Sequence, residues 1–203
     1  MTDSIAAKRG IADRASGADI TEQAQKRMRH EIVQKVPAGF PFTHDTLAML
    51  GLVTRLHAFQ EAASREIAAD NPFASASLLR SLAEVVALLS YLIEKPADLR
   101  RVSLLAGDRD RFSIGKIVEA ANRQAPGFKA VYAQLSNWAH PSHIGGNTSM
   151  TVSDDNHFTW QSNPTFKDDD DACTMYLWLL ELTEVAGPLW CRLWDAASGE
   201  ATA

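Results

Sequence analysis

The stretch from Phe73 to Glu94 limits the fold more than any other part of the chain. Its large apolar residues recur at helical spacing and cover well over half of the helix circumference. They are Leu78, Leu79, Leu82, Val85, Val86, Leu89, Leu92 and Ile93. A surface helix carries a narrower apolar stripe, so this pattern predicts a central helix that other elements surround.

The remaining stripe of this helix holds small and polar residues at spacings of three or four. They are Ser77, Arg80, Glu84, Ala87 and Tyr91. A solvent face usually carries more Lys and Glu and fewer small residues, so we expect another element to pack on this stripe. Arg80 and Glu84 should then be partly buried and paired, one helical turn apart.

Helical spacing also predicts helices over residues 21–36, 43–69, 97–105, 114–122, 128–140 and 168–194. Thr43 and Asn71-Pro72 are start signals for two helices, and Gly187-Pro188 is expected to kink the last one. Alternating apolar residues predict strands only near 148–152 and 158–160. The predicted class is all-α, an antiparallel helical bundle with a small β-hairpin between the penultimate and last long helices. We expect the hairpin to cover the mouth of the bundle near His140.

Composition indicates one ordinary globular domain of 203 residues, with 46% apolar and 22% charged residues. Residues 1–20 are small, polar and weakly patterned, which predicts a flexible N-terminus and a single helical domain over residues 21–203. The net charge of −5 argues against a large nucleic-acid surface but allows a local one. The acidic excess lies in residues 154–203, which hold two Lys/Arg against ten Asp/Glu.

Cysteine usage and hydropathy predict a cytoplasmic location. Cys173 and Cys191 form no Cys-x-x-Cys pattern and suggest no disulfide framework, which fits a reducing compartment. The sequence has no uncharged apolar run of the roughly 18 residues that a membrane span needs. It also lacks a signal-peptide core near its start. We therefore expect neither membrane association nor secretion.

A histidine stands at the expected end of a second helix. Its apolar face is formed by Phe128, Val131, Tyr132, Leu135 and Trp138. Pro141 disfavours helical dihedral angles for the residue before it, so Ala139 or His140 should be the last helical position. The helix dipole favours a cationic imidazolium at this end, and the Pro/Ser/Gly loop that follows leaves room for a ligand.

These two helices carry an Arg-x-x-x-Glu pattern and a Tyr-x-x-Leu-Ser-x-x-x-His-Pro pattern. The residues concerned are Arg80, Glu84, Tyr132, Leu135, Ser136, His140 and Pro141. The combination resembles a group of uncharacterised bacterial all-helical proteins related to the HEPN (higher eukaryote and prokaryote nucleotide-binding) superfamily, over roughly residues 43–194. Its catalytic members resemble metal-independent ribonucleases that use Arg and His four to six residues apart on one helix. No histidine here has an arginine at that spacing. The ribonuclease activity that the resemblance implies would therefore need Arg80, which lies on a different helix.

The candidate site combines this resemblance with the local chemistry. We predict Arg80, Glu84 and His140 as catalytic residues of a metal-independent endoribonuclease with a toxin-like or defence role. His140 would act as general acid or base, Arg80 would stabilise phosphate charge, and Glu84 would orient Arg80. The predicted binding residues are Ser77, Ser136, Asn137, His143 and Tyr91. The expected partners are RNA or a nucleotide, a second copy in a homodimer and a regulatory partner protein, and no cofactor or metal is expected.

Three alternatives stay open. In the first, the same pocket holds a nucleotide or phosphate ligand without turnover. In the second, Arg80 and Glu84 form an internal ion pair in a helical scaffold that works through dimerisation or partner contacts. In the third, His140, His143 and His157 bind zinc or manganese together with Asp154 or Asp155, although their spacing matches no compact motif.

Overall fold

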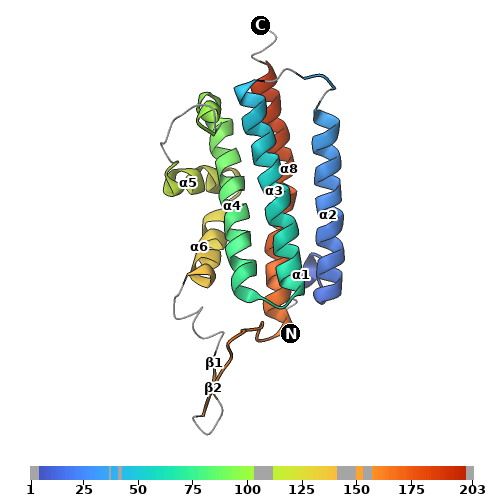
Figure 1. The fold of residues 1–203 in the computed structure, drawn as a ribbon, viewed down its shortest axis with the longest axis vertical. Coiled ribbons are helices and arrows are strands. Elements are labelled where there is room, and N and C mark those ends of the chain that lie inside the picture. Colours follow the sequence, from blue (N-terminus) through green and yellow to red (C-terminus); the bar gives the residue numbers. More distant parts are fainter. Residues whose placement is uncertain are drawn as a thin grey trace.

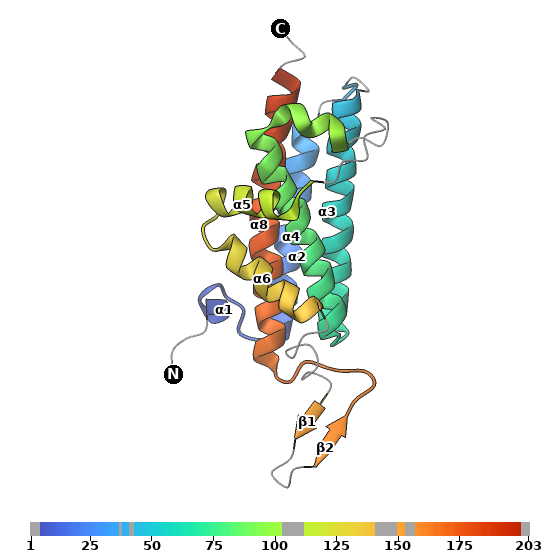
Figure 2. The ribbon, with the colours of Figure 1, turned by 90° about the vertical axis from the view of Figure 1, so that its left-hand side faces the viewer.

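The protein forms an all-α helical bundle, as predicted (Figures 1 and 2). The computed structural model describes residues 5–36, 38–40, 43–102, 112–140, 150–152 and 157–199. The long helices α2, α3, α4 and α8 lie side by side, and the shorter α5 and α6 pack on α4. The elements are α1 (Ile5–Lys8), α2 (Arg14–Lys35), α3 (His44–Ala68), α4 (Pro72–Glu94), η1 (Pro96–Val102), α5 (Ile114–Gln124), α6 (Phe128–Ala139), β1 (Met150–Val152), β2 (Phe158–Trp160) and α8 (Asp169–Gly199).

Side-chain caps set where α3 and α4 begin. The Thr43 hydroxyl accepts the N–H of Thr46 at 3.1 Å, and the Thr46 hydroxyl accepts the N–H of Thr43 at 2.8 Å. Asn71 accepts the N–H of Ala74 at 3.2 Å, and Pro72 occupies the first turn, where its missing N–H costs no helical hydrogen bond. Both predicted start signals are confirmed.

Helix α2 begins at Arg14, which corrects the helix predicted over residues 21–36, and α1 precedes it at Ile5–Lys8. Helix α2 begins directly after Asp13, because Asp13 and Ser16 form a capping box in which each side chain accepts the backbone N–H of the other. A Cβ on Gly17 would lie 2.7 Å from Cδ2 of Tyr176, so only glycine allows α2 to approach α8 this closely. Gly17 is one of the small residues on which the prediction of flexibility was based, and its lack of a side chain permits this packing of α2 on α8.

Helix α8 supplies the largest buried side chain of the core. Trp190 is fully buried, and its indole N–H donates to the carbonyl of Met49 at 3.0 Å. Its ring stacks on Trp194 with 5.2 Å between centroids. The helix is continuous through Pro188. Apolar residues nearly all round α8 are therefore explained by contact with α2, α3 and α4.

Helix α4 is the central helix that its apolar pattern predicts. It packs against α3, α5, α6 and α8, and Leu79, Leu82 and Leu89 are fully inaccessible to solvent. Among the described residues, α4 is the one helix that is long and apolar enough to cross a membrane by length and composition. The core helix of a bundle passes the same test, and the packing of α4 is that of a core helix.

A half-buried histidine, His57, lies on α3 near Arg29 of α2. The Nε2 atom of His57 is buried without a hydrogen-bond partner. Burial lowers the pKa of His57 below its ordinary value of 6.5, Arg29 acts in the same direction, and Glu61 acts in the opposite direction. Arg29 and Glu61 also form an ion pair at 2.9 Å between the two helices. Folding therefore favours the neutral form of the His57 imidazole.

Replacing His57 with glutamine is expected to flatten the dependence of stability on pH. Because its pKa is lowered on folding, the unfolded chain binds more protons than the folded one just below pH 6.5. The wild-type free energy of unfolding should thus fall as the pH falls from 6.5 to the folded-state pKa, and the variant should lose this part of the decrease. Urea unfolding of both proteins at several pH values measures it, and equal slopes would contradict it.

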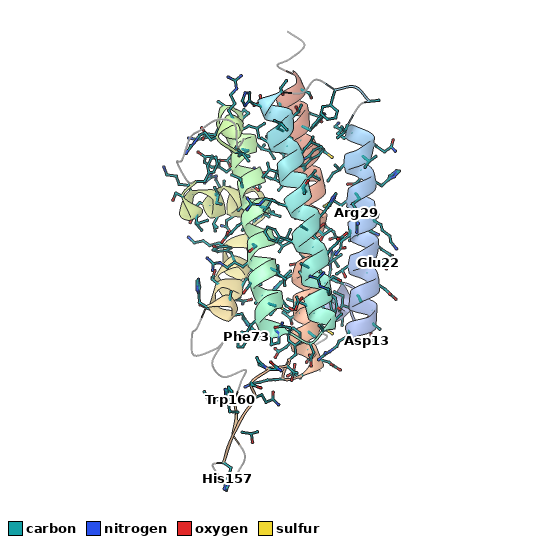
Figure 3. All side chains as sticks on the ribbon, viewed as in Figure 1. Asp13, Glu22, Arg29, Phe73, His157 and Trp160 are labelled. Carbon is teal, nitrogen blue, oxygen red and sulfur yellow. The ribbon has the colours of Figure 1, made fainter. Side chains whose placement is uncertain are left out.

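Two short strands follow α6 in the chain. They pair antiparallel, with Met150 opposite Trp160 and Val152 opposite Phe158. The predicted hairpin is described only to this extent, because its turn, residues 153–156, lies outside the described residues. Figures 1 and 2 show the strands projecting beyond the end of the bundle, and Figure 3 shows Trp160 and His157 on this projection, beyond Phe73 at the start of α4. The strands therefore extend away from the bundle, which corrects the expectation that they cover its mouth.

Candidate functional site

Arg80 and Glu84 lie one turn apart on α4, on the side where α6 packs. The Nε atom of Arg80 lies 3.3 Å from Oε1 of Glu84. The two side chains are 26% and 33% exposed. The predicted pairing and partial burial are thus confirmed, and the pair remains accessible to a ligand.

His140 lies directly after the last helical residue of α6, as the position of Pro141 predicts. Its backbone is extended, with φ −93° and ψ 153°, and its N–H donates to the carbonyl of Ser136 at 3.0 Å. Helix α6 is held against α4 by the buried Phe128 and Leu135. The side chain of His140 is exposed, so the helix presents an imidazole at its carboxyl end.

The structure brings Arg80 and His140 into direct contact, although they are 60 residues apart in the chain. Nη1 of Arg80 lies 2.8 Å from Nε2 of His140. On the other side of the guanidinium, Nε donates to the hydroxyl of Tyr132 at 3.4 Å. That hydroxyl donates to Oε1 of Glu84 at 2.9 Å. Four side chains from two helices therefore form one hydrogen-bonded network.

The chemistry of the guanidinium sets the direction of the hydrogen bond between Arg80 and His140. A guanidinium has only N–H donors and no acceptor, so Nε2 of His140 must accept. An imidazolium has N–H groups on both nitrogens and cannot accept a hydrogen bond. In this contact Nε2 of His140 is therefore the acceptor and Nη1 of Arg80 the donor.

Tyr132 belongs to this network, although it was not among the predicted site residues. Its ring lies under the guanidinium of Arg80, with 5.7 Å from Cζ to the ring centroid, and its hydroxyl joins Arg80 to Glu84. The available signal was spacing, because Tyr132, Ser136 and His140 follow one another at intervals of four residues on one side of α6.

The predicted binding residues are distributed unevenly around this network. Ser77 is exposed on α4, one turn before Arg80, and its carbonyl accepts the hydroxyl of Ser81 at 2.9 Å. Ser136 is half-buried on α6, and Asn137 is exposed beside it. His143 lies outside the described residues. Ser77, Ser136 and Asn137 thus flank the network on the two helices that build it.

Tyr91 belongs to a different cluster, which corrects its placement among the site residues. It lies eleven residues after Arg80 on α4, a rise of about 16 Å along the helix axis. Its hydroxyl donates to Oδ2 of Asp98 in η1 at 2.7 Å, and its ring meets Phe112 edge-on. The hydrogen bond to Asp98 and burial raise the pKa of Tyr91. The hydroxyl of Tyr91 is thus hydrogen-bonded to a carboxylate of η1, a contact that helical spacing along α4 could not predict.

Metal ligands do not gather in the part of the chain that the structure describes. No group of three His, Cys, Asp or Glu side chains there is arranged to hold an ion. Of the residues weighed for a metal site, His143, Asp154 and Asp155 lie outside that part, and His140 contacts Arg80.

Comparison with known proteins gives no assignment for this site. No family model matches the chain, and no curated protein and no solved structure matches it.

Proposed function

We propose that the protein acts on RNA and cleaves it without a metal ion at the Arg80–His140 site. The observation that carries the proposal is the 2.8 Å contact between Nη1 of Arg80 and Nε2 of His140. It places an anion-binding guanidinium and an unprotonated imidazole nitrogen within reach of a single phosphodiester. Both side chains are accessible from solvent.

In the proposed reaction, the phosphodiester displaces the imidazole from Nη1 of Arg80. Nε2 of His140 then takes the proton of the ribose 2′-hydroxyl as that oxygen attacks the adjacent phosphorus. The bond from phosphorus to the 5′-oxygen breaks, the leaving oxygen takes a proton from water, and a 2′,3′-cyclic phosphate forms. The hydroxide that remains takes the proton from Nε2 of His140 and so restores the base. Arg80 stabilises the negative charge that builds up on the phosphate oxygens in the transition state.

Glu84 and Tyr132 act in this proposal as positioning residues. Both contact Nε of Arg80, so they hold the guanidinium while its terminal nitrogens face the ligand. Ser77, Ser136, Asn137 and His143 would contact the substrate beside the reacting phosphate. Trp160, which is 70% exposed on the projecting strands, would offer a face for base stacking.

The resemblance to the HEPN superfamily supports this proposal and extends it. We propose that the chain is a distant relative of that group and acts in the cytoplasm as a homodimer. A toxin-like or defence role and a regulatory partner protein belong to the same proposal. The expectations that it needs no cofactor and associates with no membrane stay predictions.

A second candidate function is ligand binding without catalysis, and the hydrogen bonds within the network favour it. Arg80 has partners in Glu84, Tyr132 and His140 without any substrate, so the site is complete as a binding device. A non-catalytic module for a nucleotide or phosphate ligand would use the same residues, with Arg80 as the anion ligand. A purely structural scaffold would use them as an ion-pair network between α4 and α6.

Replacing His140 with asparagine is expected to abolish RNA cleavage. The wild-type protein should cleave labelled total RNA in EDTA and leave 2′,3′-cyclic phosphate ends, which periodate resistance and end-specific ligation detect. Loss of general base catalysis should lower the rate by about 10²–10⁴-fold. The matched control is His30→Asn, at an exposed histidine on α2, which should cleave like wild type. Absence of cleavage by folded wild type, or cleavage that His140→Asn retains, would overturn the proposal.

A further inference from the structure

Arg80 lies in a part of the chain that holds few other cations. Residues 66–94 contain Arg80 as their one Lys or Arg, and residues 130–166, which run from α6 through both strands, contain neither. The one cation of α6 is Lys129, eleven residues before His140, a rise of about 16 Å along a helix axis. Lys129 also pairs with Glu119 of α5. The two helices that build the network therefore present one guanidinium to an anion at this site.

Carboxylates gather at the end of the bundle to which His140 belongs. The carboxyl end of α6 and the first turns of α4 and α8 lie at this end (Figures 1 and 2). Residues 168–171 are four consecutive Asp at the start of α8, and the cations near them are Arg14 and Lys167. This turn is thus net negative. A nucleic-acid strand that followed its own phosphates past the site toward this end would be repelled.

The two strands that project beyond this end carry exposed apolar side chains. Met150 and Trp160 are cross-strand partners and are 43% and 70% exposed, with Trp160 on the projection in Figure 3. Partners directly opposite each other lie on the same face of a ladder, so these two side chains form one apolar face. Nucleic-acid bases stack on aromatic faces of this kind. The strands therefore suit contacts with bases better than contacts with phosphates.

We infer that the ligand of this site is a short oligoribonucleotide segment held by one phosphate and by its bases, with the phosphates on either side left in solvent. The inference rests on the proposed function and deepens it, because Arg80 then contacts the phosphate that is cleaved and no other. Affinity should stop increasing once the bases next to that phosphate are present. It should also depend weakly on salt, because few counterions are released when one phosphate is neutralised.

Binding of 2′-fluoro RNA tests this inference without cleavage, since a fluorine cannot attack the phosphorus. A dinucleotide, a tetranucleotide and a 20-mer, all without terminal phosphates, would be titrated by NMR at several KCl concentrations. The logarithm of the association constant should fall against the logarithm of salt concentration with a slope of about −0.7, whereas contact with six phosphates would give about −4. Per phosphodiester, the tetranucleotide and the 20-mer should bind within about threefold of each other, as expected for one phosphate contact.

Two variants identify the cation. Arg80→Gln should weaken binding and remove the salt dependence. The matched control Lys129→Gln removes the cation of α6, whose side chain is 62% exposed, and should leave both the slope and the affinity unchanged. A slope of about −2 or steeper, the value for three phosphates, would overturn the inference. So would affinity per phosphodiester that rises up to the 20-mer, a slope that Lys129→Gln reduces, or no binding by any of the three.

This inference and the ribonuclease proposal can fail separately. Cleavage of natural RNA together with a steep salt slope would overturn the inference and leave the ribonuclease proposal standing. Binding with the slope of one phosphate, lost in Arg80→Gln, but without cleavage of natural RNA would support the inference and overturn the ribonuclease proposal.

Discussion

Replacing Arg80 with alanine is expected to lower the rate of RNA cleavage by about 10²–10³-fold, the usual effect of removing one preorganised group that stabilises transition-state charge. The free energy of unfolding should fall by no more than about 1 kcal/mol, because the pair of Arg80 with Glu84 is partly exposed and the hydroxyl of Tyr132 still donates to Glu84 in its absence. Cleavage assays in EDTA and urea unfolding measure the two effects on the same protein.

This pair of measurements separates the enzymatic proposal from the scaffold alternative. If the network only joins α4 to α6, its loss should destabilise the protein by about 3–5 kcal/mol, the cost of leaving a buried charge without its partner. A large loss of stability would therefore favour the scaffold. The control Arg65→Ala removes an arginine whose side chain is 72% exposed on α3, and it should change neither quantity.

Replacing Trp190 with alanine is expected to cost about 3–5 kcal/mol of unfolding free energy, the range for large aromatic residues in a core. Trp190 is fully buried on α8, and its removal would leave a cavity and delete the hydrogen bond to the carbonyl of Met49. Neighbouring Trp194 can fill only part of this space, because it already stacks on the lost ring. Urea unfolding followed by circular dichroism at 222 nm measures the difference.

The matched control is Trp160→Ala, which removes the same side chain from a position that is 70% exposed. Its free energy of unfolding should stay within about 0.5 kcal/mol of wild type, as for most surface substitutions. Equal effects of the two substitutions would contradict the placement of Trp190 at the centre of the bundle. Loss of RNA binding in Trp160→Ala with unchanged stability would support the stacking role proposed for that ring.

Those parts of the site that depend on one helix could be predicted from the sequence. The pairing of Arg80 with Glu84 follows from their spacing, and the end of α6 at His140 follows from the restriction that Pro141 places on the preceding residue. The central position of α4 follows from its broad apolar surface. Each of these properties is encoded within a few turns of one segment.

The parts that depend on how two elements meet could not be predicted in the same way. The sequence places Tyr132 on the apolar face of α6. Only the packing of α6 on α4 shows that the hydroxyl of Tyr132 reaches Arg80 and Glu84. Tyr91 has the right spacing on the polar stripe, but Asp98 from η1 engages its hydroxyl. The close approach of Gly17 on α2 to Tyr176 on α8 could not be predicted, because the two residues lie far apart in the chain.

The packing of α2 on α8 has a consequence for how the chain folds as it is synthesised. Helix α2 is made early, but its principal partner is the last helix, so its apolar side stays uncovered until residues 169–199 leave the ribosome. The network of Arg80 and His140, by contrast, is built within residues 72–140, from segments that emerge one after another. A nascent chain thus holds every residue of the network before α2 has docked on α8.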